Sequence, residues 1–289
     1  MIELLVVSVI WSFSFPLIGM YLKGLDGSFV AFARMALAFL VFLPFLRPRR
    51  IPPDLALRLV GIGALQLGVM YVAYLNSYRF LKFHEVALFT VLTPLWITLI
   101  DGAISRRLTV RFHLAAGIAI AGAVVLKWQG KDLTGDFIGI LLVQVSNAAF
   151  GVGQVLYRRT MAGAKDIPHR RAMGWMYIGA VWVTLAATAA TTDLPTLSVT
   201  PAQAGVIVYL GIVAAGLGFF LWNRGATKVS AGVLAVMNNG YLPIVIVVGL
   251  VVFGKDADPV RLAIGTVLIV AALLVNGRSL SADSWRGRQ

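Results

Sequence analysis

Residues 231–253 read AGVLAVMNNGYLPIVIVVGLVVF, a run of apolar character with no formal charge. A helix of about 20 residues spans the hydrocarbon core of a bilayer, which is roughly 30 Å thick, so this run is long enough to cross a membrane. Its middle, MNNGYLP at positions 237 to 243, contains two amides, a glycine and a proline. This interruption is either a water-filled site in a membrane protein or a surface turn in a soluble one.

The composition decides between these two interpretations. Of 289 residues, 59% are hydrophobic and 13% are charged, whereas about a quarter are charged in a typical soluble domain. The mean hydropathy is +0.87, and long apolar runs recur along almost the whole chain. The protein is therefore predicted to be a polytopic membrane protein. The net charge of +13 lies in short loops, which favours membrane topology over nucleic-acid binding. The absence of cysteine excludes disulfides and Cys-ligated metals.

Breaks that contain charges, proline or glycine divide the chain into ten candidate spans. Helices are predicted throughout, because an open sheet edge would leave backbone groups without hydrogen bonds in lipid. The first span has no basic segment before it, so a cleaved signal peptide is not expected. The ten predicted spans are residues 3–22, 28–46, 56–77, 84–104, 111–128, 136–157, 171–191, 203–222, 231–253 and 260–277.

Ten spans place both termini on the same side of the membrane, and the loop charges predict which side this is. The loops on the side of the termini carry 17 lysines and arginines, whereas the opposite loops carry 7. The positive-inside rule therefore predicts cytoplasmic N and C termini for a protein of the cell inner membrane.

The two halves of the chain resemble each other. Leu114 to Gly117 read LAAG and Leu262 to Gly265 read LAIG, 148 positions later, while Pro94 and Pro243 are 149 positions apart. Five spans in each half make the repeat inverted, an architecture that places one substrate site near the midplane. The predicted units are a first five-helix repeat at 1–130, a second at 131–278 and a cytoplasmic tail at 279–289.

Several short motifs resemble those of the drug/metabolite transporter superfamily, in particular the EamA-type ten-helix exporters of amino acids and metabolites. The motifs are Trp11-Ser-Phe-Ser-Phe-Pro16, Ala33-Arg34-Met35-Ala36-Leu37, Leu92-Thr93-Pro94-Leu95 and Tyr241-Leu242-Pro243. The resemblance implies helices arranged around a central cavity, and export of amino acids, related metabolites or drugs. The chain departs from that family at Ser105-Arg106 and Gly254-Lys255, where such proteins often carry Gly-Glu.

Ionisable groups inside spans are expensive, at about 2.5 to 3.5 kcal/mol near a helix centre, so each calls for an explanation. Asp101 is the one carboxylate clearly inside a predicted span, either paired with Arg106 and Arg107 at the helix end or acting in gating or coupling. The lack of a midplane carboxylate argues against organic cations as substrates and against the simplest proton antiport. Arg34 either binds a substrate carboxylate with its planar fork of donors, snorkels to the interface, or bonds to backbone carbonyls.

Aromatic and uncharged polar side chains supply the other candidates for substrate contact. Buried amides either bridge helices or face water, and Gln144 and Asn147 share one helical face because they are three residues apart. Pro16, Pro94 and Pro243 are predicted hinges, because proline removes a helix hydrogen bond. The predicted substrate-binding residues are Trp11, Ser14, Arg34, Tyr71, Thr90, Thr93, Trp96, Gln144, Asn147, Asn238, Asn239 and Tyr241.

The leading functional hypothesis is an inner-membrane transporter that exports amino acids or related small metabolites by alternating access. The same fold moving organic anions, nucleosides or neutral and amphipathic drugs is the first alternative. A membrane enzyme or a scaffold without transport is the second, disfavoured because no catalytic constellation is visible. The expected partners are a small-molecule substrate and the lipid bilayer, with no nucleic acid, cofactor or metal. A homodimer is possible, and the sequence does not determine the oligomeric state.

Overall fold

The computed structural model describes residues 2–104, 106, 134–229, 234, 237–241 and 267. This part of the chain is helical, as predicted, and seven of its helical segments are long and apolar enough to cross a membrane. They correspond to the first four predicted spans and to the sixth, seventh and eighth. The predicted fifth and tenth spans, most of the ninth with Pro243, and the tail at 279–289 lie outside the described residues.

The helices follow one another with short connections, and two of the spans change helix type part-way. In chain order they are α1 (Ile2–Tyr21), α2 (Gly27–Phe42), η1 (Leu43–Phe45), η2 (Pro48–Arg50), α3 (Pro53–Gly63), η3 (Ala64–Val69), α4 (Met70–Ser77), α5 (Phe83–Thr90), α6 (Thr93–Ile104), α8 (Thr134–Ala162), α9 (His169–Thr191), η4 (Leu194–Thr196), α10 (Pro201–Tyr209), η5 (Leu210–Leu217) and α11 (Gly218–Ala226).

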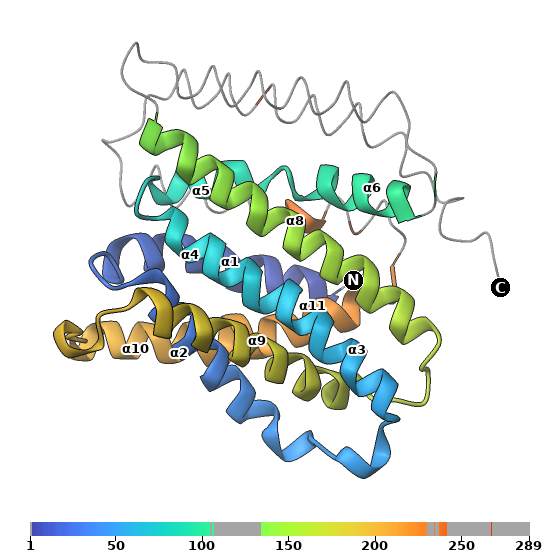
Figure 1. The fold of residues 1–289 in the computed structure, drawn as a ribbon. Helices are drawn as coiled ribbons and strands as arrows, with labels where there is room; N and C mark the ends of the chain where they lie inside the picture. The colour runs from blue at the N-terminus through green and yellow to red at the C-terminus, as the bar shows by residue number, and fades with distance from the viewer. Residues whose placement is uncertain are drawn as a thin grey trace.

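The long helices pack side by side into one bundle (Figure 1). Helix α9 packs against α2 and α3, α8 packs against α4 and α6, and α1 packs against α11. Segments from both halves of the sequence are therefore interleaved, and α1, α4, α8 and α11 come together around the middle of the bundle.

The bundle has an apolar exterior and a partly polar interior. Leu57, Phe137 and Trp182 on the outside are 73%, 64% and 67% exposed, which suits contact with lipid tails rather than water. Polar side chains such as Gln66 and Asn223 are completely buried. Large apolar side chains on the outside of the bundle agree with the predicted membrane class.

Two spans contain π-helical turns at corresponding positions. The third span changes from α3 to the π-helix η3, and the eighth changes from α10 to the π-helix η5, whose first residue, Leu210, follows Ala64 by 146 positions. A reciprocal amide pair joins these spans, because Gln66 Nε2 donates to Asn223 Oδ1 at 2.9 Å and Asn223 Nδ2 donates to Gln66 Oε1 at 3.4 Å. Each buried amide thus satisfies the other.

Glycine allows α3 and α9 to approach each other closely. A Cβ atom added at Gly63 would overlap the backbone of Met176, and one added at Gly179 would overlap the carbonyl of Val60. Gly61, two residues away on α3, has nothing within 4 Å of an added Cβ. The two glycines of α3 therefore form a matched pair with opposite surroundings.

We expect Gly63→Val to lower the thermal midpoint of the detergent-purified protein by roughly 5 °C, because overpacking of a close helix contact destabilises by about 1 to 3 kcal/mol. Gly61→Val introduces the same residue into the same helix and should leave the midpoint nearly unchanged. Unfolding followed by intrinsic tryptophan fluorescence measures both. Equal midpoints in the two variants would contradict the close contact.

Candidate functional site

The fourth span is broken between α5 and α6, and Pro94 explains the break. Proline has no backbone N–H, so Pro94 cannot donate to the carbonyl of Thr90 as the fourth residue of a continuous helix would. The hydroxyl of Thr93 donates to that carbonyl instead, at 2.6 Å. Val91 and Leu92 form a turn between the helices, and α6 begins at Thr93 with Pro94 in its first turn.

Amides of α8 bind to the broken segment. Asn147 Nδ2 donates to the carbonyl of Phe89 at 2.9 Å and to Gln144 Oε1 at 3.3 Å, and the Thr93 hydroxyl lies 3.1 Å from Asn147 Oδ1. Gln144 Oε1 also accepts from Trp96 Nε1 at 2.9 Å. Gln144 and Asn147 do share one face of α8, and this face adds a donor to the carbonyl of Phe89, which also accepts from the Leu92 N–H at 3.3 Å.

A cavity of about 620 Å³, counting its solvent-facing space, lies beside this network. Helices α1, α2, α4, α5, α6, α8 and α11 and the described part of the ninth span contribute to its wall, and none of the wall residues in the described part of the chain is acidic. The wall consists of Trp11, Ser14, Phe15, Arg34, Met70, Tyr71, Tyr74, Thr90, Thr93, Ser146, Asn147, Phe150, Phe219, Asn238 and Tyr241.

Arg34 is the one cation in the described wall of this cavity, and its side chain is buried at 1% exposure. Its Nη2 donates to the Tyr71 hydroxyl at 3.0 Å, and its guanidinium carbon lies 4.4 Å from the centre of the Tyr71 ring. Its Nε and Nη1 form no hydrogen bond to any described residue. Arg34 is therefore buried within the bundle, does not bind a described backbone carbonyl, and keeps two unused donors beside the cavity.

Aromatic rings form the apolar part of the wall. Phe219 lies 5.0 Å from Trp11, 5.8 Å from Tyr71 and 6.1 Å from Phe150 between ring centroids. The Trp11 indole is held in place because its Nε1 donates to the carbonyl of Ala214 at 3.0 Å. These rings offer large, rigid faces to an apolar part of a ligand.

The structure brings nine of the twelve predicted binding residues to the cavity and leaves three away from it. Trp96 and Gln144 lie behind Asn147 in the hydrogen-bonded network. Asn239 is also outside the wall, although its neighbour Asn238 lines it, because successive residues of a helical turn point in different directions. The wall residues outside the predicted set of binding residues are Phe15, Met70, Tyr74, Ser146, Phe150 and Phe219.

Asp101 and the three prolines that were predicted to be hinges lie in different settings. Asp101 forms an ion pair with Arg159 of α8 at 2.7 Å rather than with Arg106, because α6 and α8 pack side by side. Pro94 lies at a helix break, whereas α1 continues through Pro16. Pro243 lies outside the described residues. Within the described ranges, no cluster of three acidic or histidine side chains is arranged to hold a metal.

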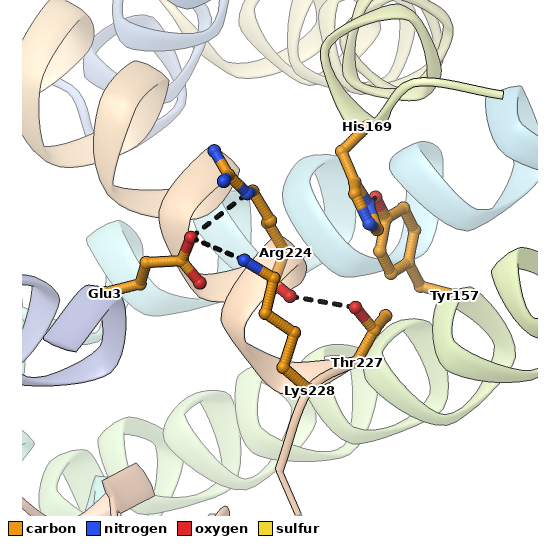
Figure 2. Close-up of polar contacts among 6 residues, drawn as sticks. All are labelled: Glu3, Tyr157, His169, Arg224, Thr227 and Lys228. Carbon is orange, nitrogen blue, oxygen red and sulfur yellow. Dashed lines mark hydrogen bonds and ion pairs between the residues drawn. The ribbon is translucent and has the colours of Figure 1, made fainter. Parts of the chain in front are cut away.

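A second polar cluster lies at the end of the bundle that the loop charges predict to be cytoplasmic (Figure 2). Glu3 Oε1 accepts from Arg224 Nε and from Lys228 Nζ, both at 3.0 Å, which ties the start of α1 to the end of α11. The Tyr157 hydroxyl lies 2.7 Å from His169 Nδ1 and joins α8 to the start of α9. These contacts lie outside the cavity wall, and the ion pairs of Glu3 connect α1 with the end of α11, two helices that contribute to it.

The sequence pattern of the EamA-like transporter family matches residues 1–128 and again residues 137–278. The chain belongs to the EamA-like transporter family. It is therefore a multi-pass membrane transporter and not an enzyme, and the alternative of a membrane enzyme or scaffold is discarded. A solved crystal structure has the same fold, with a TM-score of 0.66 and 18% identity over 99% of this chain and 98% of that one.

The chain is also similar to curated members of this family over nearly its full length. It is 43% identical over 276 residues to a probable biotin transporter of Pseudomonas aeruginosa, covering 94% of this chain and 96% of the relative. It is 40% identical over 288 residues to the biotin transporter of Escherichia coli K12, covering 97% and 94%. The biotin transporter of Salmonella typhimurium is 39% identical over 284 residues, with the same coverage.

The ion pairs of Glu3 allow a test of whether this end of the bundle restricts access of a reagent to the cavity. The chain has no cysteine, so Ser8→Cys provides a single thiol on α1, between Glu3 and the wall residue Trp11, at a position only 4% exposed. We expect Glu3→Gln to speed labelling at position 8 by a membrane-impermeant maleimide about fivefold, because a partly exposed ion pair contributes at most about 1 kcal/mol. On the topology that the loop charges predict, inside-out vesicles present this end of the bundle to the reagent.

Asp54→Asn is the matched control for that experiment, since Asp54 is an exposed acid at the same end, in the first turn of α3. It should leave the labelling rate unchanged. Equal rates for Glu3→Gln and its parent would show that Glu3 does not restrict access to α1.

Proposed function

We propose that this protein transports biotin and that Arg34 binds the carboxylate of the substrate. The supporting observation is a buried guanidinium in a cavity whose described wall contains no acid. A buried ion without a counter-ion is unfavourable by several kcal/mol, so the setting of Arg34 favours an anionic ligand. The planar fork of an arginine matches a carboxylate, which accepts two parallel hydrogen bonds.

The names of the relatives indicate which carboxylate this is. Three relatives that are about 40% identical over nearly the whole chain are named biotin transporters, the Pseudomonas aeruginosa protein as a probable one. Biotin is a monocarboxylate at neutral pH, with an uncharged bicyclic ring at the other end of a short aliphatic chain. One cation and a neutral, partly aromatic wall suit this charge distribution.

Biotin replaces the amino acids that the sequence led us to expect. An amino acid is a zwitterion, and its ammonium group requires an acceptor of negative charge that the described wall does not contain. Biotin falls within the organic anions of the first alternative. The export direction inferred from family resemblance stays a prediction, and the assay described below measures flux both ways.

The transport mechanism in this proposal is alternating access by two inverted repeats, at 1–130 and 131–278. Two observations support the repeats: the family pattern matches the chain twice, and the third and eighth spans carry π-helical turns at corresponding positions. Inverted repeats that rock about a shared site expose it to each side of the membrane in turn.

We expect Arg34→Met to lower the uptake efficiency for biotin at least roughly 30-fold, because truncating one partner of a buried charge pair costs about 2 kcal/mol or more. Arg34→Lys keeps the charge but loses the fork, so its uptake should fall between those of Arg34→Met and the parent. Proteoliposomes with the purified protein, supplied with labelled biotin inside or outside, measure the flux.

Arg58→Met is the matched control, because Arg58 is an exposed arginine of α3 outside the cavity wall. It should transport biotin like the parent protein. Parent proteoliposomes that move no more biotin than empty liposomes would overturn the proposed function. Transport that survives unchanged in Arg34→Met would keep the substrate but remove Arg34 from its binding site.

A further inference from the structure

Biotin carries a cyclic urea at the end opposite its carboxylate, and resting on the proposed function we infer a separate subsite for this group. We propose that Asn147 Oδ1 and the Thr93 hydroxyl oxygen together accept a hydrogen bond from one N–H group of the substrate's cyclic urea, with Gln144 as the positioning residue. Asn147 and Thr93 both line the cavity, and their side-chain oxygens are 3.1 Å apart.

The orientation of the Asn147 amide follows from its partners. Its Nδ2 faces the carbonyl of Phe89 at 2.9 Å, and a carbonyl can only accept, so the nitrogen must lie on that side. The second Nδ2 hydrogen is directed at Gln144 Oε1, 3.3 Å away. Both donors of the amide are therefore used, and the oxygen of Asn147 is the atom that faces Thr93.

A count of protons leaves this pair of oxygens one hydrogen short. The Thr93 hydroxyl has one proton and two nearby acceptors, the carbonyl of Thr90 at 2.6 Å and Asn147 Oδ1 at 3.1 Å. The Thr90 carbonyl is the shorter contact, and Pro94 cannot supply it with an amide donor. When the proton goes to Thr90, two acceptors face each other without a hydrogen between them. An N–H group of a ligand supplies the missing hydrogen.

Two neighbouring residues complete the subsite. Gln144 lies outside the cavity wall, and its Oε1 is fixed by the indole N–H of Trp96 at 2.9 Å, so it can hold the Asn147 amide in place. Ser146 lies in the wall, is 5% exposed and forms no side-chain hydrogen bond to any described residue. Its hydroxyl is available to donate to the urea carbonyl. The subsite thus offers a pair of acceptors for one N–H group and a donor for the carbonyl of a cyclic urea.

Two competitors of labelled biotin separate this subsite from that of Arg34. Desthiobiotin keeps the carboxylate and the cyclic urea, whereas lipoate keeps a pentanoate carboxylate and a sulfur ring but has no urea. We expect the parent protein to prefer desthiobiotin over lipoate by at least about tenfold, because a site with polar groups left unpaired rejects a ligand that cannot pair them.

Thr93→Val and Asn147→Leu should raise the half-inhibitory concentration of desthiobiotin about tenfold and leave that of lipoate within about twofold. Gln144→Leu should also raise the half-inhibitory concentration of desthiobiotin relative to that of lipoate, but by less. Thr93→Ser keeps the hydroxyl and should preserve the preference. Thr184→Val is the matched control, since Thr184 is a fully buried threonine of α9 that bonds to Ala180 and does not line the cavity.

The outcomes distinguish the subsite from the proposed function. Parent vesicles that take up no biotin would overturn the proposed function, and this inference with it. Intact biotin uptake with an unchanged desthiobiotin to lipoate ratio in Thr93→Val would overturn the subsite alone, because a purely structural role of Thr93 weakens both competitors equally. If Asn147→Leu does not fold, as judged by its thermal midpoint, the pair Thr93→Val and Thr93→Ser decides the question.

Discussion

Backbone carbonyls inside a bilayer have no water from which to accept hydrogen bonds, so a broken helix there needs protein donors. The break that precedes Pro94 meets this constraint with side chains: the Thr93 hydroxyl donates to Thr90, and the Asn147 amide donates to Phe89. Both side chains also line the cavity. The polar wall therefore arises from a structural requirement, and the geometry of the break determines which of its atoms remain for a ligand.

The third and eighth spans depart from regular α-helix in another way. A π-helical turn inserts an extra residue into the ladder and changes which side chains face inward beyond it. In the third span this turn precedes Tyr71 and Tyr74, and in the eighth it precedes Phe219, so both turns lie next to wall residues. The Gln66 and Asn223 amides then connect the two spans in hydrocarbon, where neither amide has another strong partner among the described side chains.

Much of the fold could be predicted from the sequence, because charge-free runs of spanning length leave little choice inside a membrane. The residues of the site were harder to predict than the fold. The spacing of Gln144 and Asn147 identified a shared face but not its depth, and Gln144 lies one layer behind the wall. Asp101 pairs with Arg159, 58 positions away, and no local sequence pattern predicts such a distant partner. Phe150 and Phe219 were missed because an aromatic residue in a cavity wall resembles one in any apolar core.

Arg34 shows why a single charge in such a cavity matters beyond affinity. Tyr71 provides one hydrogen bond and a ring face, which partly compensate the guanidinium but leave its net charge unbalanced. The side chain is only 1% exposed, so water does little to stabilise this charge, and a buried charge without a counter-ion is unfavourable by several kcal/mol. A bound carboxylate makes the site neutral and removes most of that penalty. In the proposed alternating-access cycle, this one residue thus favours the loaded carrier over the empty one in every state that keeps Arg34 buried, which is the condition for moving substrate rather than cycling without it.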